Sequence, residues 1–258
     1  MLRSVITGIG HYLPAKIVTN KDLEAKVETS DEWIRERTGI AQRHIAAEGE
    51  FTSDLAANAA KAALIQAGIT AAQIDCIIVA TTSPDETLPA TATRVQYKLG
   101  STTGFAFDIQ AACSGFVYAL SVADGLIRSG QIKRAIVIGA ETYSRIVDWN
   151  DRGTCILFGD GAGAVVLEAQ KNTDRGILYT TTYSDGQFAD LLKTTGGAST
   201  TQTVGALYMN GREVFRHAAT KMGEALVAAA QGADIALSEI DWVIPHQANA
   251  RIVSAMAE

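Results

Sequence analysis

The segment Phe105-Ala-Phe-Asp-Ile-Gln-Ala-Ala-Cys113-Ser-Gly-Phe-Val-Tyr-Ala-Leu120 decides the fold that we predict for this chain. Its first five residues, Phe105 to Ile109, form a short apolar run of the kind found in buried strands. A helical pattern begins at Phe116 and continues to Arg128, just before Gly130, which is placed to stop a helix. A strand, a tight corner and a helix therefore follow one another directly, which favours a layered α/β fold.

The same alternation of helices and apolar strands continues on both sides of this segment. Thr52 to Ala67 has the spacing of a buried helix, with Gly68 placed to end it. Ile74 to Ala80 is an almost wholly apolar run, and Ala135 to Gly139 is another. Uninterrupted apolar strands are typical of a sheet that is covered by helices on both faces.

A weak internal repeat links the two ends of the chain. The stretch Gln73-Ile-Asp-Cys-Ile-Ile78 recurs 166 residues later as Glu239-Ile-Asp-Trp-Val-Ile244. Helical patterns precede both stretches, at Leu55 to Ala67 and at Val214 to Ala230. Either this is an echo that any α/β protein can give, or the chain is built from two versions of one unit.

Duplication predicts a first half over residues 1–172, which carries Cys113, and a second half over residues 173–258, which carries His246. The counterparts of the later strands of the first half would fall beyond Glu258. We therefore expect the second sheet to be incomplete in this chain.

Composition places the chain among folded globular proteins, with 47% hydrophobic and 19% charged residues in 258. A net charge of -6 gives no reason to expect nucleic acid or an anionic membrane as a partner. No apolar run approaches the ~20 residues that span a bilayer, and no secretory signal is visible. Three widely spaced cysteines fit neither a disulfide framework nor a zinc site, which indicates free thiols in the cytoplasm. No metal or other cofactor is expected.

Cys113 is the candidate nucleophile. A cysteine at a helix N-terminus lies near unpaired N–H groups and the positive end of the helix dipole, and both favour the thiolate. The same N–H groups could hold the oxygen of a bound thioester. The alternative is a buried structural thiol. It fits Cys76 and Cys155 better, because each lies in an apolar, strand-like run. The corner therefore predicts acyl transfer through a thioester on Cys113.

His246 is the candidate catalytic partner among four histidines. It follows the repeated strand directly, at the edge of a sheet where α/β proteins build their sites. His11 and His44 lie in polar, loop-like sequence, and His217 faces outward in a helical pattern. The alternative role for His246 is to cap the helix predicted from Gln247 to Ala257.

Five motifs run along the chain in a fixed order. They are Thr29-Ser-Asp-Glu-Trp33-Ile-Arg-Glu-Arg37-Thr-Gly-Ile, Asp108-Ile-Gln-Ala-Ala-Cys113-Ser-Gly, Asp151-Arg152-Gly-Thr, Phe158-Gly-Asp-Gly-Ala-Gly-Ala164 and Pro245-His246-Gln-Ala-Asn249-Ala-Arg251. Together they resemble β-ketoacyl-[acyl-carrier-protein] synthase III, the condensing enzyme that starts bacterial fatty acid synthesis. The resemblance implies a thiolase-like fold, in which two similar α/β halves each hold a mixed five-stranded sheet, and a homodimer.

The chain departs from this family at its end. Family members continue into a Gly-Asn-Thr-Ser-like segment, whose asparagine completes a Cys-His-Asn triad. No residue in this sequence matches that asparagine, and Asn249 belongs to a different motif. We expect the functional protein to extend past Glu258, and a chain of these 258 residues alone to condense poorly.

The resemblance implies a reaction in two halves. Cys113 attacks the thioester of acetyl-CoA or another short acyl-CoA, and CoA leaves. Malonyl-[acyl-carrier-protein] then loses CO2, and the resulting enolate carbon attacks the acyl-Cys113 thioester. His246 and the family's asparagine would each donate a hydrogen bond to the thioester oxygen on which negative charge develops.

The resemblance also assigns binding roles to other residues. Trp33 and Arg152 resemble the pair that stacks on the adenine of CoA. Thr29 and Arg37 resemble further CoA contacts, and Asn249 resembles a contact with the pantetheine arm. Trp33 could equally be a core residue.

The resemblance assigns carrier-protein docking and acyl-chain selection to three other residues. Gln247 and Arg251 resemble residues that dock the acidic carrier protein, although Arg251 could simply be a solvated helix charge. Leu88 matches a position that lines the acyl pocket of the partner subunit.

Three rival functions remain on the sequence alone. A Cys-His hydrolase would use water as the acyl acceptor. A thiolase-like or ketide-forming enzyme would share the fold, and an inactive fragment would only bind acyl-CoA. The run Gly159-Asp-Gly-Ala-Gly163 lacks the G-x-G-x-x-G spacing and is followed by a strand-like segment, so we do not predict a dinucleotide site.

Overall fold

The structure is a computed structural model that describes residues 2–257, and the chain divides into two compact units. The first comprises the N-terminal region to Lys16, His44–Thr142 and Asp160–Thr182. The second comprises Ile17–Arg43, Tyr143–Gly159 and the chain from Tyr183 onward. The units therefore interleave along the sequence, whereas the predicted halves, 1–172 and 173–258, follow the internal repeat and remain a prediction.

The first unit is built on a five-stranded mixed sheet with the strand order β1-β7-β6-β4-β5. Its strands are β1 (Leu2–Tyr12), β4 (Cys76–Ala80), β5 (Phe105–Ile109), β6 (Arg134–Thr142) and β7 (Asp160–Lys171). The central strand β4 is parallel to both of its neighbours, and β7 is antiparallel to β6 and β1. Every residue of β4 is buried, as its apolar run predicted.

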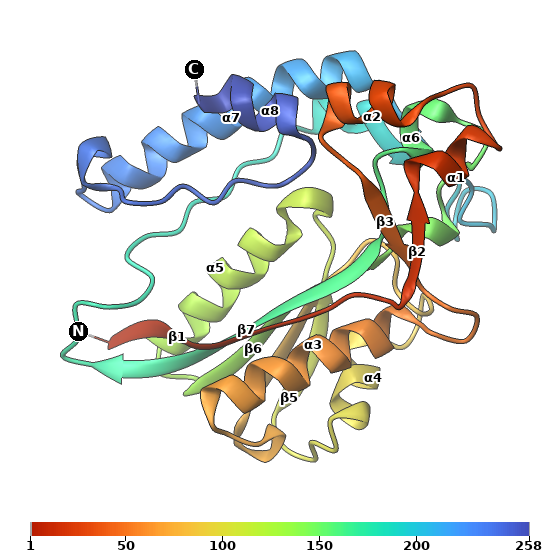
Figure 1. Ribbon diagram of the computed structural model, residues 1–258. Coiled ribbons are helices and arrows are strands. Elements are labelled where there is room, and N and C mark those ends of the chain that lie inside the picture. Colours follow the sequence, from red (N-terminus) through yellow and green to blue (C-terminus); the bar gives the residue numbers. More distant parts are fainter. Residues whose placement is uncertain (1, 258) are drawn as a thin grey trace. The chain divides into compact units, whose positions relative to one another are not determined.

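Helices cover both faces of this sheet. Helices α3 (Thr52–Ala67) and α4 (Thr91–Lys98) lie on one face, and α5 (Gly115–Arg128) lies on the other (Figure 1). Gly8 and Gly10 of β1 allow α3 to approach the strand closely. A Cβ atom on either glycine would clash with the helix, because it would lie 2.2 Å from a backbone carbonyl oxygen of α3. Helix α3 begins and ends where predicted, with Gly68 in the left-handed conformation at φ 68°.

The second unit contains one long helix, α7 (Gly211–Gly232), and otherwise short elements. The short helices and strands are β2 (Lys16–Thr19), α1 (Asn20–Glu24), α2 (Asp31–Thr38), β3 (Gln42–Ile45), α6 (Arg152–Cys155), β8 (Leu192–Thr194), β9 (Leu207–Met209) and α8 (Ala250–Ala257). Strands β2 and β3 pair with each other, as do β8 and β9. Within residues 2–257 this unit holds no five-stranded sheet. Its core contains Leu23, Ile34, Val147, Cys155, Ile156 and Leu207.

One local feature recurs at the repeat distance of 166 residues, but one predicted strand does not form. Gly68, the C-terminal cap of α3, and Asp234, which follows the cap of α7, both have a left-handed φ, 68° and 56° respectively. The strand predicted in the repeated stretch Glu239 to Ile244 does not form, and Trp242 is 85% exposed. A strand exists through hydrogen bonds to a neighbour, and no segment within residues 2–257 pairs with this stretch.

Three further predictions about local structure were wrong. His11 lies in the edge strand β1 and His44 in β3, not in loops, because a strand with an open edge or face tolerates polar side chains. Cys155 ends the short helix α6 instead of lying in a strand.

No helix within residues 2–257 is both long enough and apolar enough to span a membrane.

Candidate active site

Cys113 stands at a strained corner between β5 and α5. A single 3-10 turn, Ala112–Ser114, joins the strand to the helix. Ala112 has a φ of 45°, in the left-handed region that residues with a Cβ rarely adopt. Cys113 itself is exposed, whereas Cys76 and Cys155 are fully buried. Strain of this kind persists only where the surrounding structure enforces it, and it often marks functional sites.

The electrostatic setting of the thiol differs from the prediction. Desolvation raises the pKa of Cys113, and the charge of Glu141 raises it further, while a backbone hydrogen bond lowers it. Part of the residue reaches the surface, but protein atoms around the sulfur displace water, which disfavours the thiolate. The helix-terminus effect is therefore outweighed. The buried thiol of Cys76 is more strongly affected, since desolvation raises its pKa to about 12.

Glu141 is a site residue that the sequence did not suggest. It lies near the end of β6, and its carboxylate accepts hydrogen bonds of 2.5–3.2 Å from the turn that follows β4. Desolvation raises the pKa of Glu141, and these hydrogen bonds oppose that shift. The sequence feature that could have identified Glu141 is the presence of a carboxylate near the end of an apolar strand. The donors are the hydroxyls of Thr81, Thr82 and Ser83 and the N–H groups of Thr82 and Ser83.

Replacing Glu141 by Gln is expected to lower the pKa of the Cys113 thiol, because the change removes a negative charge that opposes thiolate formation. The measurement is the rate of Cys113 alkylation by iodoacetamide as a function of pH, followed by peptide mass spectrometry. The midpoint should move to lower pH. A midpoint that stays in place or moves upward would contradict the assigned electrostatic coupling, and Cys113→Ser supplies the background of unspecific labelling.

Asp108 connects the cysteine corner to the loop that carries Leu88. Its carboxylate accepts hydrogen bonds from the N–H groups of Thr91 and Ala92, at 2.6 and 2.7 Å, and so caps the first turn of α4. Leu88 precedes a cis bond to Pro89 and is 83% exposed. The Asp108 motif thus holds the start of α4, and the loop before it, against the strand that leads to the cysteine.

In the second unit, two of the predicted CoA contacts, Arg37 and Arg152, lie against a third, Trp33. The guanidinium carbon of Arg37 lies 4.4 Å, and that of Arg152 4.7 Å, from the centre of a Trp33 ring. Arg152 also donates a hydrogen bond of 2.9 Å to the carbonyl of Glu28. The next residue, Thr29, has a hydroxyl oxygen that is shielded from solvent and has no hydrogen-bond partner within the described residues. We call Trp33 and Arg152 the clamp pair.

The clamp pair is in direct contact in this structure. Stacked planar groups lie about 3.5 Å apart, so a base inserted between Trp33 and Arg152 would need a separation of about 7 Å. The observed 4.7 Å leaves no room for one. A base can therefore enter only after the Arg152 side chain moves away. Trp33 is half-buried and packs against the core of its unit, as its alternative role as a core residue predicted, and its contact with CoA stays a prediction.

The remaining predicted residues lie around α8. His246 lies in irregular chain after Pro245, and desolvation lowers its pKa, which favours the neutral imidazole. The Asn249 side chain accepts a 3.0 Å hydrogen bond from the N–H of Ile252, so Asn249, and not His246, caps the helix. Helix α8 consequently begins at Ala250 and not at Gln247.

The two predicted docking residues differ in their contacts. Arg251 lies in α8, with its guanidinium 5.8 Å from the ring of Phe215 in α7. Gln247 donates a hydrogen bond to the carbonyl of Pro245. Cys113 and Leu88 belong to the first unit, and all other predicted site residues belong to the second.

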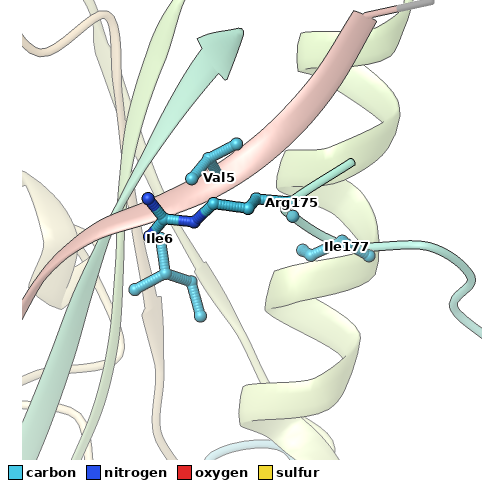
Figure 2. A pocket seen from close by; sticks show the side chains of 5 residues that line it. Val5, Ile6, Arg175 and Ile177 are labelled. Carbon is cyan, nitrogen blue, oxygen red and sulfur yellow. The ribbon is translucent and has the colours of Figure 1, made fainter. Parts of the chain in front are cut away.

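A separate pocket lies beside β1, away from the predicted site residues. Figure 2 shows Val5 and Ile6 from the strand together with Arg175 and Ile177 from the chain after β7. Arg175 is its one charged lining residue, and none of the predicted catalytic or binding residues contributes to it. This pocket is therefore set aside, and the candidate functional regions are the cysteine corner in the first unit and the Trp33 cluster in the second unit.

Comparisons with known proteins agree with the motifs. Residues 107–186 match the family 3-Oxoacyl-[acyl-carrier-protein (ACP)] synthase III. Beta-ketoacyl-[acyl-carrier-protein] synthase III of Paramagnetospirillum magneticum is 60% identical, over 100% of this chain and 81% of that protein. The Cereibacter sphaeroides protein of the same name is 59% identical, over 100% and 80%. The crystal structure of 3-oxoacyl-[acyl-carrier-protein] synthase III from Aquifex aeolicus is 46% identical, with a TM-score of 0.92 over 98% of this chain and 80% of that one.

Proposed function

We propose a division of roles among the site residues on one premise: this chain belongs to the 3-oxoacyl-[acyl-carrier-protein] synthase III family. It is an acyl-transferring condensing enzyme of the thiolase fold, and it carries out the condensation that initiates fatty acid synthesis. The family uses an acyl-CoA and malonyl-[acyl-carrier-protein] as substrates. Acetyl-CoA or another short acyl-CoA is the donor that we propose for this chain.

Cys113 is the proposed nucleophile, and the observation that carries this role is its exposure at the strained corner while both other cysteines are buried. The sulfur attacks the carbonyl carbon of the acyl-CoA, a new C–S bond forms, and the C–S bond to CoA breaks. The Cys113 thiol loses one proton and the departing CoA sulfur gains one, so the first half-reaction leaves the proton balance unchanged.

His246 is the proposed electrostatic catalyst of the second half-reaction. Malonyl-[acyl-carrier-protein] loses CO2, and negative charge develops on its thioester oxygen. A neutral imidazole N–H can donate a hydrogen bond to that oxygen, and the lowered pKa of His246 favours the neutral form. The enolate carbon then attacks the acyl carbon and displaces the Cys113 thiolate, which takes up one proton from water.

The Trp33 cluster is the proposed site for the adenine end of CoA. Trp33 and Arg152 offer an aromatic face and a planar cation, which stack on flat groups. Arg37 lies on the same tryptophan, and the unpartnered Thr29 hydroxyl is an available hydrogen-bonding group once the clamp pair opens. Asn249 is proposed to contact the pantetheine arm.

The proposed partner contacts involve three exposed residues. Arg251 and Gln247 are exposed near the start of α8, where an acidic carrier protein could dock. Leu88 is exposed on a loop held by Asp108, which suits a side chain that meets the acyl pocket of a partner subunit. We propose that the enzyme works as a homodimer in the cytoplasm.

Incubation with acetyl-CoA tests the central assignment. The peptide that contains Cys113 should gain one acetyl group, detectable by mass spectrometry at a pH low enough to preserve the thioester. The Cys113→Ser variant should show no thioester-linked label. Label on Cys76 or Cys155, with none on Cys113, would refute the proposed nucleophile.

A further inference from the structure

We infer that Arg43 is a positioning residue for the clamp pair, acting through two hydrogen-bonded arms that reach the helices carrying Trp33 and Arg152. This inference rests on the proposed role of Trp33 and Arg152 in binding the adenine of CoA. Arg43 lies in β3, a strand that neither the motifs nor the proposed mechanism involves.

The burial of Arg43 calls for an explanation. The residue is only 4% exposed, and within residues 2–257 no carboxylate forms an ion pair with it. Desolvation lowers its pKa, and its Nε atom has no hydrogen-bond partner within the described residues. An apolar residue of similar size in such a place is often as stabilising or more so, so stability alone gives no reason for a buried cation here.

The first arm runs from Arg43 through Asn20 to both ends of α2. One terminal nitrogen of Arg43 donates to the Asn20 side-chain oxygen at 2.9 Å. The Asn20 amide in turn donates to the carboxylate of Asp31 at 2.8 Å and to the carbonyl of Ile40 at 2.7 Å. Asp31 is the first residue of α2 and Ile40 lies just beyond its end, so Asn20 fixes the helix that carries Trp33.

The second arm runs from Arg43 to α6. The other terminal nitrogen donates to the carbonyl of Ile156 at 2.9 Å. Ile156 is the C-terminal cap of α6, a helix of one turn whose first residue is Arg152. A single planar guanidinium therefore holds two elements that are far apart in sequence and that carry the two halves of the clamp pair. The rigid fork of an arginine sets both directions, which the single ammonium of a lysine cannot do.

This geometry predicts a defect that depends on the adenine nucleotide of the substrate. If Arg43 sets the spacing and angle of the clamp pair, its loss weakens binding of thioesters that carry the nucleotide. A thioester without the nucleotide, such as acetyl-N-acetylcysteamine, does not use the clamp pair and should react with Cys113 as before. A fold-wide defect would lower both reactions together.

The test compares Arg43→Lys with the unaltered protein on both thioesters. We expect KM for acetyl-CoA in Cys113 acylation to rise about tenfold with little change in kcat, because small misplacements of positioning groups have large effects. Acylation by acetyl-N-acetylcysteamine should stay within about twofold. The matched control is Arg134→Lys, the same change at a half-buried arginine of the first unit.

Other outcomes are equally decisive. Equal losses on both thioesters, or no loss on either, would overturn the inference. If Arg43→Lys does not fold, Asn20→Ala breaks only the first arm and should give a weaker defect that is likewise selective for acetyl-CoA. If neither thioester acylates Cys113 in the unaltered protein, the proposed function fails. The inference is then decided by calorimetric titration with CoA, whose Kd should rise in the Arg43 variant and not in the control.

Discussion

Replacing His246 by Ala is expected to lower the rate of malonyl-[acyl-carrier-protein] decarboxylation by about 10²–10³-fold, the usual effect of removing one donor to a developing oxyanion. Acyl transfer onto Cys113 should fall far less, because the thioester oxyanion that the imidazole stabilises forms in the second half-reaction. The neutral form that this role needs is the one favoured by desolvation of His246.

The two half-reactions can be measured separately in the same preparation. Release of CoA from acetyl-CoA reports loading of Cys113, and release of CO2 from malonyl-[acyl-carrier-protein] reports decarboxylation. His217→Ala is a suitable control, since His217 lies in α7 of the same unit and its ring contacts that of Phe188 in a tilted arrangement, with 4.1 Å between the ring centres. Similar losses in both half-reactions of the His246 variant would refute separate roles for the two catalytic groups.

Replacing Cys113 by Ser is expected to lower overall condensation by at least about 10³-fold, because a serine hydroxyl ionises far less readily than a thiol and must form a less reactive ester. Decarboxylation of malonyl-[acyl-carrier-protein] should persist, since in the proposed mechanism the oxyanion of that step is stabilised by His246 and requires no sulfur. The variant would thus release CO2 without forming the 3-oxoacyl product.

The matched control for Cys113→Ser is Cys155→Ala. Cys155 is fully buried at the end of α6, so its loss removes a thiol without touching the proposed nucleophile. Condensation should be retained in this variant when it is measured on the folded fraction. If Cys155→Ala abolished condensation and Cys113→Ser did not, the assignment of the nucleophile would be reversed.

Local patterns predicted the first unit well. The limits of α3 and of β5 agree with the predicted residues, because the spacing of apolar residues reflects the geometry of one helix or one strand. The corner at Cys113 was found in the same way, since a strand and a helix separated by a few small residues must turn sharply. The motif resemblance then supplied roles for residues such as Trp33 and Arg152 that no local pattern could assign.

In the second unit, local sequence patterns were less reliable, because its structure depends on contacts between residues far apart in the sequence. The same kind of pattern that correctly predicted β4 wrongly predicted a strand in the repeated stretch Glu239 to Ile244, because a strand also needs a partner and the pattern does not show whether one is present. Arg43 was overlooked for a related reason. Within its own stretch of sequence it looks like an ordinary polar residue, and its hydrogen bonds go to Val18, Asn20 and Ile156, which lie elsewhere in the sequence.

By itself, the sequence determined most local elements of the first unit and the family to which the chain belongs, and it selected Cys113 as the proposed nucleophile. Only the tertiary structure decided that the Cys113 thiol has a raised pKa, that Glu141 contributes to this shift, and that Arg152 rests on Trp33. The physical reason is the range of the forces involved. Periodicity is set by neighbours along the chain, whereas desolvation, charge coupling and stacking depend on residues that folding brings together from distant positions.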